Sequence, residues 1–152
     1  WDYIRLWKDT PLAAAVQDRI DAGYPVGGTS AGLAVLGQYY FSAEFDTVTS
    51  AEAMANPNSE KIALGKDFLK VRYLENLITD SHFSARQREG RLEVFLQKIG
   101  VAEIVGLGID EATAVLLSAD GTATVVGRAK AHVHAPGQPP RHFADGEAVL
   151  FR

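Results

Sequence analysis

Gly28-Thr29-Ser30-Ala31-Gly32 is a Gly-x-Ser-x-Gly sequence at a point where the flanking residues predict a change from strand to helix. Before it, Tyr24 to Gly27 is typical of a strand end, and the apolar run Ala31 to Leu36 is typical of a buried helix. A serine in such a turn exposes its Oγ, while neighbouring glycines let backbone and substrate approach. The motif predicts a nucleophile elbow, with Ser30 as the reactive residue and the Ala31 amide as an oxyanion donor.

The same five residues also fit a purely structural role, a glycine-rich turn in which a hydroxyl side chain caps the helix. A second segment, Thr79 to Leu92, favours the catalytic interpretation because it places His82 just before an expected helix. Ser84 and Gln87 have the spacing of a capping box, so we expect this helix to begin at Ser84.

Three arginines, Arg86, Arg88 and Arg91, fall in the first turns of that expected helix, where the positive end of the helix dipole disfavours cations. Such a departure from local preference is expected where function or a buried carboxylate needs the charge. A solvated basic face is the alternative. We predict that at least one of the arginines faces the Ser30 cleft or pairs with a nearby carboxylate. The candidate partners are Asp80, Asp110 and Glu111.

The segment Val105 to Leu117 has the pattern of two buried strands with an acidic pair, Asp110 and Glu111, at the break between them. A carboxylate is costly to bury without a partner, so we expect one of the two to bond a specific group, and a histidine is a sensible candidate. A plain polar turn is the alternative. Ser30, His82 and Glu111 together have the chemical types of a nucleophile, a general base and an orienting carboxylate.

The chain order Ser, His, Glu differs from that of the α/β-hydrolases. The three segments instead resemble the cyanophycinase and peptidase E group of serine peptidases. The matching motifs are Gly-Gly-Thr-Ser-Ala-Gly at 27–32, Asp-x-His-Phe at 80–83 and Gly-Ile-Asp-Glu-x-Thr-Ala at 108–114. This resemblance implies a class I glutamine amidotransferase-like α/β fold, a flavodoxin-like three-layer structure with flanking helices. It also implies a mostly parallel sheet with the elbow strand, Pro25 to Gly28, at its centre.

The resemblance implies that Ser30, His82 and Glu111 form a triad that cleaves an amide bond of a small, Asp-containing peptide through an acyl-enzyme. It further implies substrate-binding roles in the base segment for Asp80, Ser81, Arg86, Arg88 and Arg91. Ser81 stands where cyanophycinases often have glutamine, which argues against cyanophycin itself as the substrate. The alternatives are a promiscuous esterase that uses the same triad and a noncatalytic subunit.

The resemblance covers only the carboxyl-terminal part of the family's domain, in which earlier strands and a second oxyanion donor would precede Trp1. We therefore expect a processed, split or truncated chain that lacks the amino-terminal strands. Because an uncovered parallel strand exposes unpaired backbone groups and apolar faces, we also expect association. The expected partner is a copy of the chain or a complementary amino-terminal fragment.

Composition limits the other possibilities. The 152 residues are 47% hydrophobic, enough for a single domain over 1–152, and the net charge of −4 disfavours nucleic acid and anionic membranes as partners. The chain has no cysteine, and no apolar run approaches the roughly 18 residues of a membrane span. His132 and His134 share a face of an expected strand, but a solvated face is favoured over a metal site. We expect no metal or cofactor and a cytoplasmic location.

Overall fold

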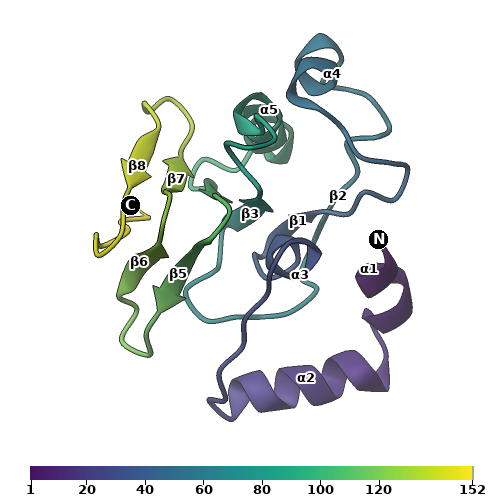
Figure 1. Cartoon of the computed structure of the whole chain (residues 1–152). Coiled ribbons are helices and arrows are strands. Elements are labelled where there is room, and N and C mark those ends of the chain that lie inside the picture. The colour runs from purple at the N-terminus through teal and green to yellow at the C-terminus, as the bar shows by residue number, and fades with distance from the viewer. Residues whose placement is uncertain (152) are drawn as a thin grey trace.

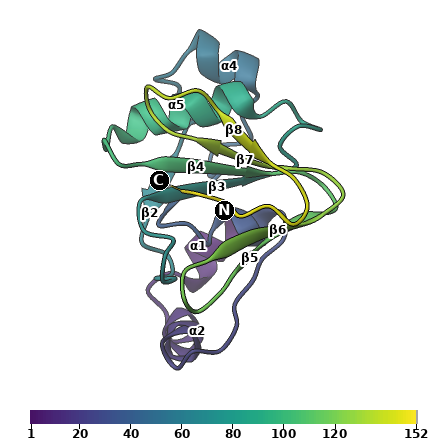
Figure 2. The same cartoon turned by 90° about the vertical axis from the view of Figure 1, so that its left-hand side faces the viewer.

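A mixed β-sheet lies between two layers of other elements in the computed structural model, which describes residues 1–151 (Figures 1 and 2). The helices are α1 (Asp2–Trp7), α2 (Pro11–Asp21), α3 (Ala31–Ala34), α4 (Ser50–Ala55) and α5 (Glu89–Ile99). The strands are β1 (Tyr39–Phe41), β2 (Leu64–Lys66), β3 (Leu77–Ser81), β4 (Val105–Ile109), β5 (Thr113–Leu117), β6 (Ala123–Gly127), β7 (Ala131–His134) and β8 (Arg141–Phe143). The sequence prediction of an α/β fold is confirmed.

The main sheet has the strand order β2-β1-β3-β4-β7-β8, while β5 and β6 form a separate hairpin. β3 runs parallel to β1 and β4, whereas the remaining neighbours pair antiparallel. The expectation of a mostly parallel sheet is therefore wrong. A parallel pair needs a long crossover, usually a helix, and α5 is the last described helix. The β5–β6 hairpin connects β4 to β7 and a short loop connects β7 to β8, and both pairs are antiparallel.

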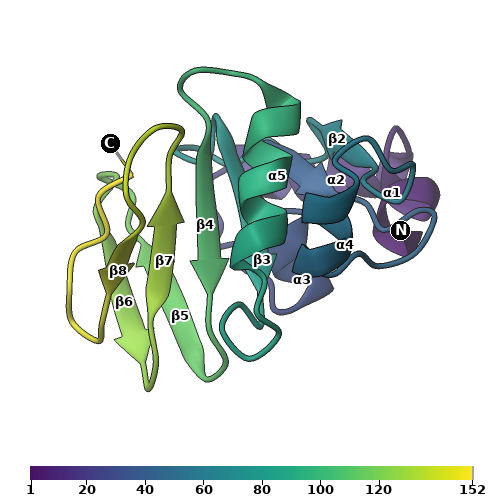
Figure 3. The ribbon, with the colours of Figure 1, turned by 90° about the horizontal axis from the view of Figure 1, so that it is seen from above.

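The central strands β3 and β4 are buried along their whole length, as expected for strands covered on both faces. On one face Ile78 packs with Leu92 and Phe95 of α5, which lies over the sheet beside α4 (Figure 3). On the other face Leu107 packs with Val125 of the β5–β6 hairpin. Each such side chain contributes about 1.5–3 kcal/mol when fully buried. The carboxyl ends of β3 and β4 are thus held by a core on either side.

The turn between β3 and α5 differs from the prediction, because α5 begins at Glu89 and not at Ser84. The backbone N–H of Ser84 donates to a carboxylate oxygen of Asp110 at 2.8 Å, and Gln87 has a φ of 50°. Both features are incompatible with a capping box at Ser84 and Gln87, which requires Ser84 to be the residue before a regular first turn. A contact with a distant loop therefore overrides the local capping signal.

The segment before the elbow also differs from the prediction, because Pro25 to Gly28 is not a strand and residues 24–27 are exposed. Both edges of β3 are already occupied by β1 and β4, so this segment has no place beside it. The helix that follows, α3, is half-buried rather than buried. It is joined to the sheet where Thr79 Oγ1 donates a hydrogen bond to the Leu33 carbonyl at 2.6 Å.

The longest helices within residues 1–151, α2 and α5, have 11 residues each, and neither they nor the shorter ones could cross a bilayer.

Candidate active site

Ser30 lies in a sharp turn at the amino end of α3. Its φ of 51° and ψ of −118° place it outside the regions that a non-glycine residue normally adopts. A Cβ atom on Gly28 would collide with the backbone of Gly32, so the turn requires glycine at position 28. Strained residues of this kind persist at functional sites, where the surrounding structure holds them. The Gly-x-Ser-x-Gly motif therefore forms the geometry of an elbow, with Ser30 exposed.

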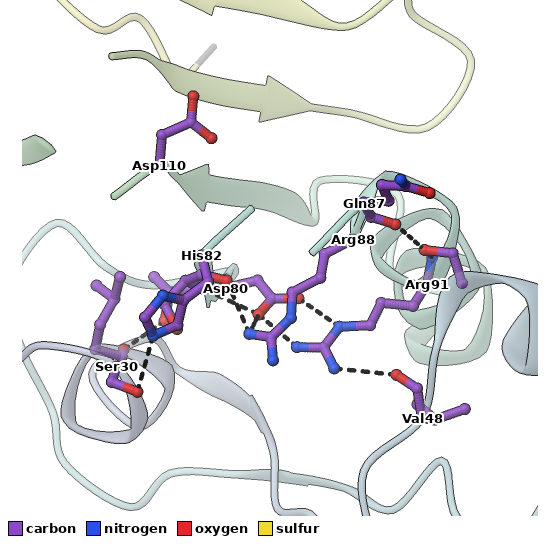
Figure 4. Close-up of polar contacts among 12 residues, drawn as sticks. Ser30, Val48, Asp80, His82, Gln87, Arg88, Arg91 and Asp110 are labelled. Atoms are coloured by element: carbon purple, nitrogen blue, oxygen red, sulfur yellow. Dashed lines mark hydrogen bonds and ion pairs between the residues drawn. The ribbon is translucent and has the colours of Figure 1, made fainter. Parts of the chain in front are cut away.

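His82, directly after β3, connects Ser30 to Glu111 through its two ring nitrogens. Its Nε2 is 3.2 Å from Ser30 Oγ and its Nδ1 is 2.8 Å from Glu111 Oε1. Figure 4 shows the imidazole ring of His82 directed at Ser30. A carboxylate at Nδ1 favours the tautomer that carries the proton there and leaves Nε2 as an acceptor. This arrangement can withdraw a proton from the serine hydroxyl.

The sheet explains why His82 and Glu111 meet. In the β3–β4 register Ser81 lies opposite Ile109, so the next residues along each strand, His82 and Asp110, leave the sheet side by side. His82 has a φ of 49° and Ala112, next to Glu111, a φ of 53°, so both loops carry strained backbone. The Glu111 side chain is 59% exposed and that of His82 is 26% exposed.

Asp110 bonds to two other segments, the turn after β3 and the residues before β7. Its Oδ1 accepts a hydrogen bond from Ser84 N at 2.8 Å, and its Oδ2 accepts one from Lys130 N at 3.3 Å and lies 3.0 Å from His132 Nε2. Burial raises the pKa of Asp110, but the hydrogen bonds with His132 and Ser84 outweigh it and hold this pKa below its ordinary value. Both acidic residues of the pair therefore have a histidine partner.

Arg88 and Arg91 both bind Asp80, which confirms the predicted pairing (Figure 4). Arg91 contacts both carboxylate oxygens, at 2.8 Å and 2.6 Å, and donates to the Val48 carbonyl at 3.1 Å. Arg88 contacts Asp80 at 2.9 Å and the Ser81 carbonyl at 2.8 Å. Asp80 is 3% exposed and Arg91 is 4% exposed. These side chains form a buried ion-pair network behind the end of β3.

A cavity of about 1100 Å³ opens beside Ser30, His82 and Glu111. Most of its walls are apolar, and they include Leu33, Leu36, Leu74, Ile109, Val115 and Leu117. Ser81 also lines it, and Arg72 is the single arginine among its described lining residues. Arg86 is exposed on the turn after β3 and is not part of this lining, and neither are Arg88 and Arg91. No sequence motif had indicated Arg72.

His132 and His134 lie on β7 as predicted, but they are buried, with 8% and 1% exposure, so the expected solvated strand face is wrong. β7 lies between β4 and β8, and the ring of Phe83 packs against both imidazoles. The two histidines bond different carboxylates, since Nδ1 of His134 lies 2.6 Å from Glu93. Residues 1–151 contain no group of three or more metal-ligating side chains placed to hold an ion.

No family model matches the chain. Cyanophycinases from Synechococcus elongatus and Thermosynechococcus vestitus are each 32% identical to it over 133 residues, and one from Geminocystis herdmanii is 30% identical over 124 residues. These alignments cover 86% and 81% of this chain but 37% and 41% of the relatives. The chain thus spans about two fifths of the length of the curated relatives it matches.

Proposed function

We propose that this chain, a distant homologue of cyanophycinases over most of its length, is part of a serine hydrolase with a class I glutamine amidotransferase-like fold. Ser30 is its nucleophile, His82 its base and Glu111 the orienting acid, and its substrate is an amide bond of a small, Asp-containing peptide. The observation that supports this most strongly is the continuous chain of contacts from Ser30 Oγ through both nitrogens of His82 to Glu111.

The proposed reaction proceeds through an acyl-enzyme. His82 Nε2 takes the hydroxyl proton as Ser30 Oγ bonds the carbonyl carbon, and Glu111 stabilises the resulting imidazolium. The amide of Ala31 stands at the first position of α3, where N–H groups lack an intrahelical acceptor, and it donates to the oxyanion. His82 then protonates the leaving amine as the C–N bond breaks. A water molecule, deprotonated by His82, hydrolyses the acyl ester and restores Ser30.

Arg72 is our candidate for recognising a carboxylate of the substrate, because it lines the cavity and its guanidinium group lies 4.6 Å from the centre of the Tyr73 ring, which also lines the cavity. Ser81 also lines the cavity and can contact the substrate. The ion-pair network of Asp80, Arg88 and Arg91 contributes indirectly, by holding the end of β3 in place. Arg72→Met should raise KM for Asp-containing dipeptides about 10-fold, the lower end of the effect of one charged hydrogen bond. Neutral esters should be unaffected.

An esterase is a second candidate for the same site. Glu111 is 59% exposed and the cavity walls are mainly apolar, so a range of acyl groups could enter. Esters also demand less from the acid that protonates the leaving group than amides do.

Hydrolysis of Asp-X dipeptides and of p-nitrophenyl esters by the wild type and Ser30→Ala tests the proposal. If the chain is a peptidase, the wild type should hydrolyse both substrates and Ser30→Ala should hydrolyse neither. Ester cleavage alone would establish the esterase, and inactivity towards both substrates would indicate a noncatalytic subunit.

We also propose that the chain associates, either with copies of itself or with a complementary amino-terminal segment. Several large apolar side chains are exposed along the segment before the elbow, and association would bury them. These exposed residues are Trp1, Tyr3, Leu6, Leu12, Tyr24 and Val26. Sedimentation at micromolar concentration should give more than 16.4 kDa, the mass of one chain. A stable monomer would contradict self-association, and absence of binding to an added amino-terminal segment would contradict complementation.

A further inference from the structure

We propose that Asp110, held by His132, is a positioning residue that sets the distance between His82 and Glu111. This inference rests on the proposed function, because it concerns how the base and its orienting acid are brought together. Asp110 is not itself a reactive group in the proposed mechanism. It acts through the two loops that carry them.

Asp110 closes a ring of contacts around the candidate base. It precedes Glu111 in the chain, and its Oδ1 accepts the hydrogen bond from Ser84 N, two residues after His82. The ring is completed by the 2.8 Å contact between His82 Nδ1 and Glu111 Oε1. A ring this short leaves little freedom for the two loops to separate.

His132 prevents the Asp110 carboxylate from rotating out of that ring. Its Nε2 is 3.0 Å from Asp110 Oδ2 and 3.3 Å from Ser84 Oγ. The side chains of Asp110 and His132 are only 10% and 11% exposed. Rotation would leave Ser84 N and Lys130 N without this acceptor and would break the contact with His132 Nε2. The carboxylate therefore has one favourable orientation.

The position of the proton on the His132 ring depends on a neighbouring side chain. Its Nδ1 lies 2.8 Å from Nδ1 of His142, so one of these two nitrogens must carry the proton that joins them. When neutral His132 donates its Nε2 proton to Asp110, its Nδ1 is bare and accepts from His142. A chain of polar contacts thus runs from the exposed His142 through His132 to Asp110.

Asp110→Asn tests the proposal, because the amide keeps the size of the side chain but replaces one acceptor oxygen with a donor. Asp145→Asn is the matched control. Asp145 Oδ1 also accepts a loop backbone hydrogen bond, from Gly127 N at 2.9 Å. Asp110 lines the cavity, whereas Asp145 and Gly127 do not. His132→Gln is a second variant that keeps a donor able to face Asp110.

Two readouts are needed, kcat and KM for a neutral ester, and the downfield proton NMR signal of His82 Nδ1–H, assigned by its absence in His82→Ala. A displacement of about 1 Å in such a site can lower the rate by about 100-fold. We expect that loss of kcat in Asp110→Asn, with KM changed less than about two-fold. The proton signal should disappear, while Asp145→Asn keeps both properties and His132→Gln loses part of kcat.

An unchanged kcat and proton signal in folded Asp110→Asn would overturn the proposal, as would an equal loss in Asp145→Asn. If Asp110→Asn does not fold, His132→Gln decides in the same way. Failure of the proposed hydrolase function has a different signature, an inactive wild type. The proton signal then decides alone, since its loss in Asp110→Asn supports the positioning role and its persistence contradicts it.

Discussion

The two sides of the candidate site are held in different ways. His82 and Glu111 follow β3 and β4, which are buried along their whole length between two parts of the core. Ser30 follows residues 21–29, of which all but the half-buried Gly28 are exposed. The base and acid thus depend on the sheet, whereas the nucleophile depends on the local geometry of one turn. Substitutions on the two sides should therefore separate activity from stability.

The largest effects should come from the reactive residues of both sides. Ser30→Ala and His82→Ala should each lower kcat by about 10⁶-fold, and Glu111→Gln by about 10⁴-fold, because it orients the base and does not itself react. Steady-state hydrolysis of the best substrate measures the effects, with circular dichroism as the check on folding. Turnover by Ser30→Ala at the wild-type rate would show that the nucleophile is wrongly assigned.

Two arginines of the base segment should differ sharply in their effect on stability. Arg91→Met leaves the buried Asp80 with a weakened ion pair and should lower the free energy of unfolding by about 3–5 kcal/mol. Arg86→Met alters an exposed side chain and should change it by less than about 0.5 kcal/mol. Urea denaturation measures both. Equal destabilisation by the two substitutions would mean that the Asp80 network does not stabilise the part of the fold that carries His82.

The same Arg86→Met variant also tests the sequence prediction that Arg86 recognises substrate carboxylates. A rise in KM for Asp-X dipeptides that neutral esters do not show would support that prediction. Equal KM values for variant and wild type would leave Arg72 as the remaining candidate.

Two glycines allow the contrast to be tested with one kind of substitution. Gly28→Ala should open the elbow, because its Cβ would collide with the Gly32 backbone, and it should abolish activity with little change in Tm. In Gly106→Ala the new Cβ would lie 2.9 Å from Leu92 of α5, and overpacking of this kind costs about 1–3 kcal/mol. That variant should keep its activity well below its Tm. The opposite pattern would contradict the proposed division between the two sides.

Acid should lower the free energy of unfolding of the part of the fold that carries His82 and Glu111, by less than the substitutions above. The pKa of Asp110 lies below its ordinary value of 3.8, so its stabilisation is present above that pH and is lost as the pH falls through the lower, folded pKa. Burial lowers the pKa of His142 below 6.5, so acid also favours the unfolded state there. Unfolding free energies between pH 7 and pH 3 should therefore fall, and Asp110→Asn should reduce the dependence near pH 3. The same acid dependence in that variant would exclude Asp110 as a source.

Local sequence patterns predicted those parts of the molecule that depend on neighbours in the chain. The apolar runs around Asp110 and Glu111 correctly indicated the positions of β4 and β5, but only β4 is buried, and β5 alternates between half-buried and exposed residues. The sharp turn at Ser30 followed from its motif. The resemblance to the cyanophycinase and peptidase E group brought together three distant motifs, and the contacts in the structure join the same three side chains. Their catalytic roles stay predictions.

The errors arose where distant segments compete with local preference. Asp110 binds the Ser84 amide and displaces the start of α5, and β1 and β4 occupy both edges of β3 and exclude the segment before Gly28. Burial of His132 follows from the antiparallel pairing of β7 with β4, and no local pattern encodes that pairing. Arg72 lies between motifs, so only the shape of the cavity identifies it.

Covalent labelling by a fluorophosphonate tests most directly whether Ser30 is a nucleophile activated by His82. The proposed mechanism predicts one adduct per chain, located by mass spectrometry on the peptide that contains Ser30. The adduct should be absent in Ser30→Ala and should form far more slowly in His82→Ala. An unlabelled wild-type chain, an adduct on another residue, or undiminished labelling of Ser30→Ala would contradict it.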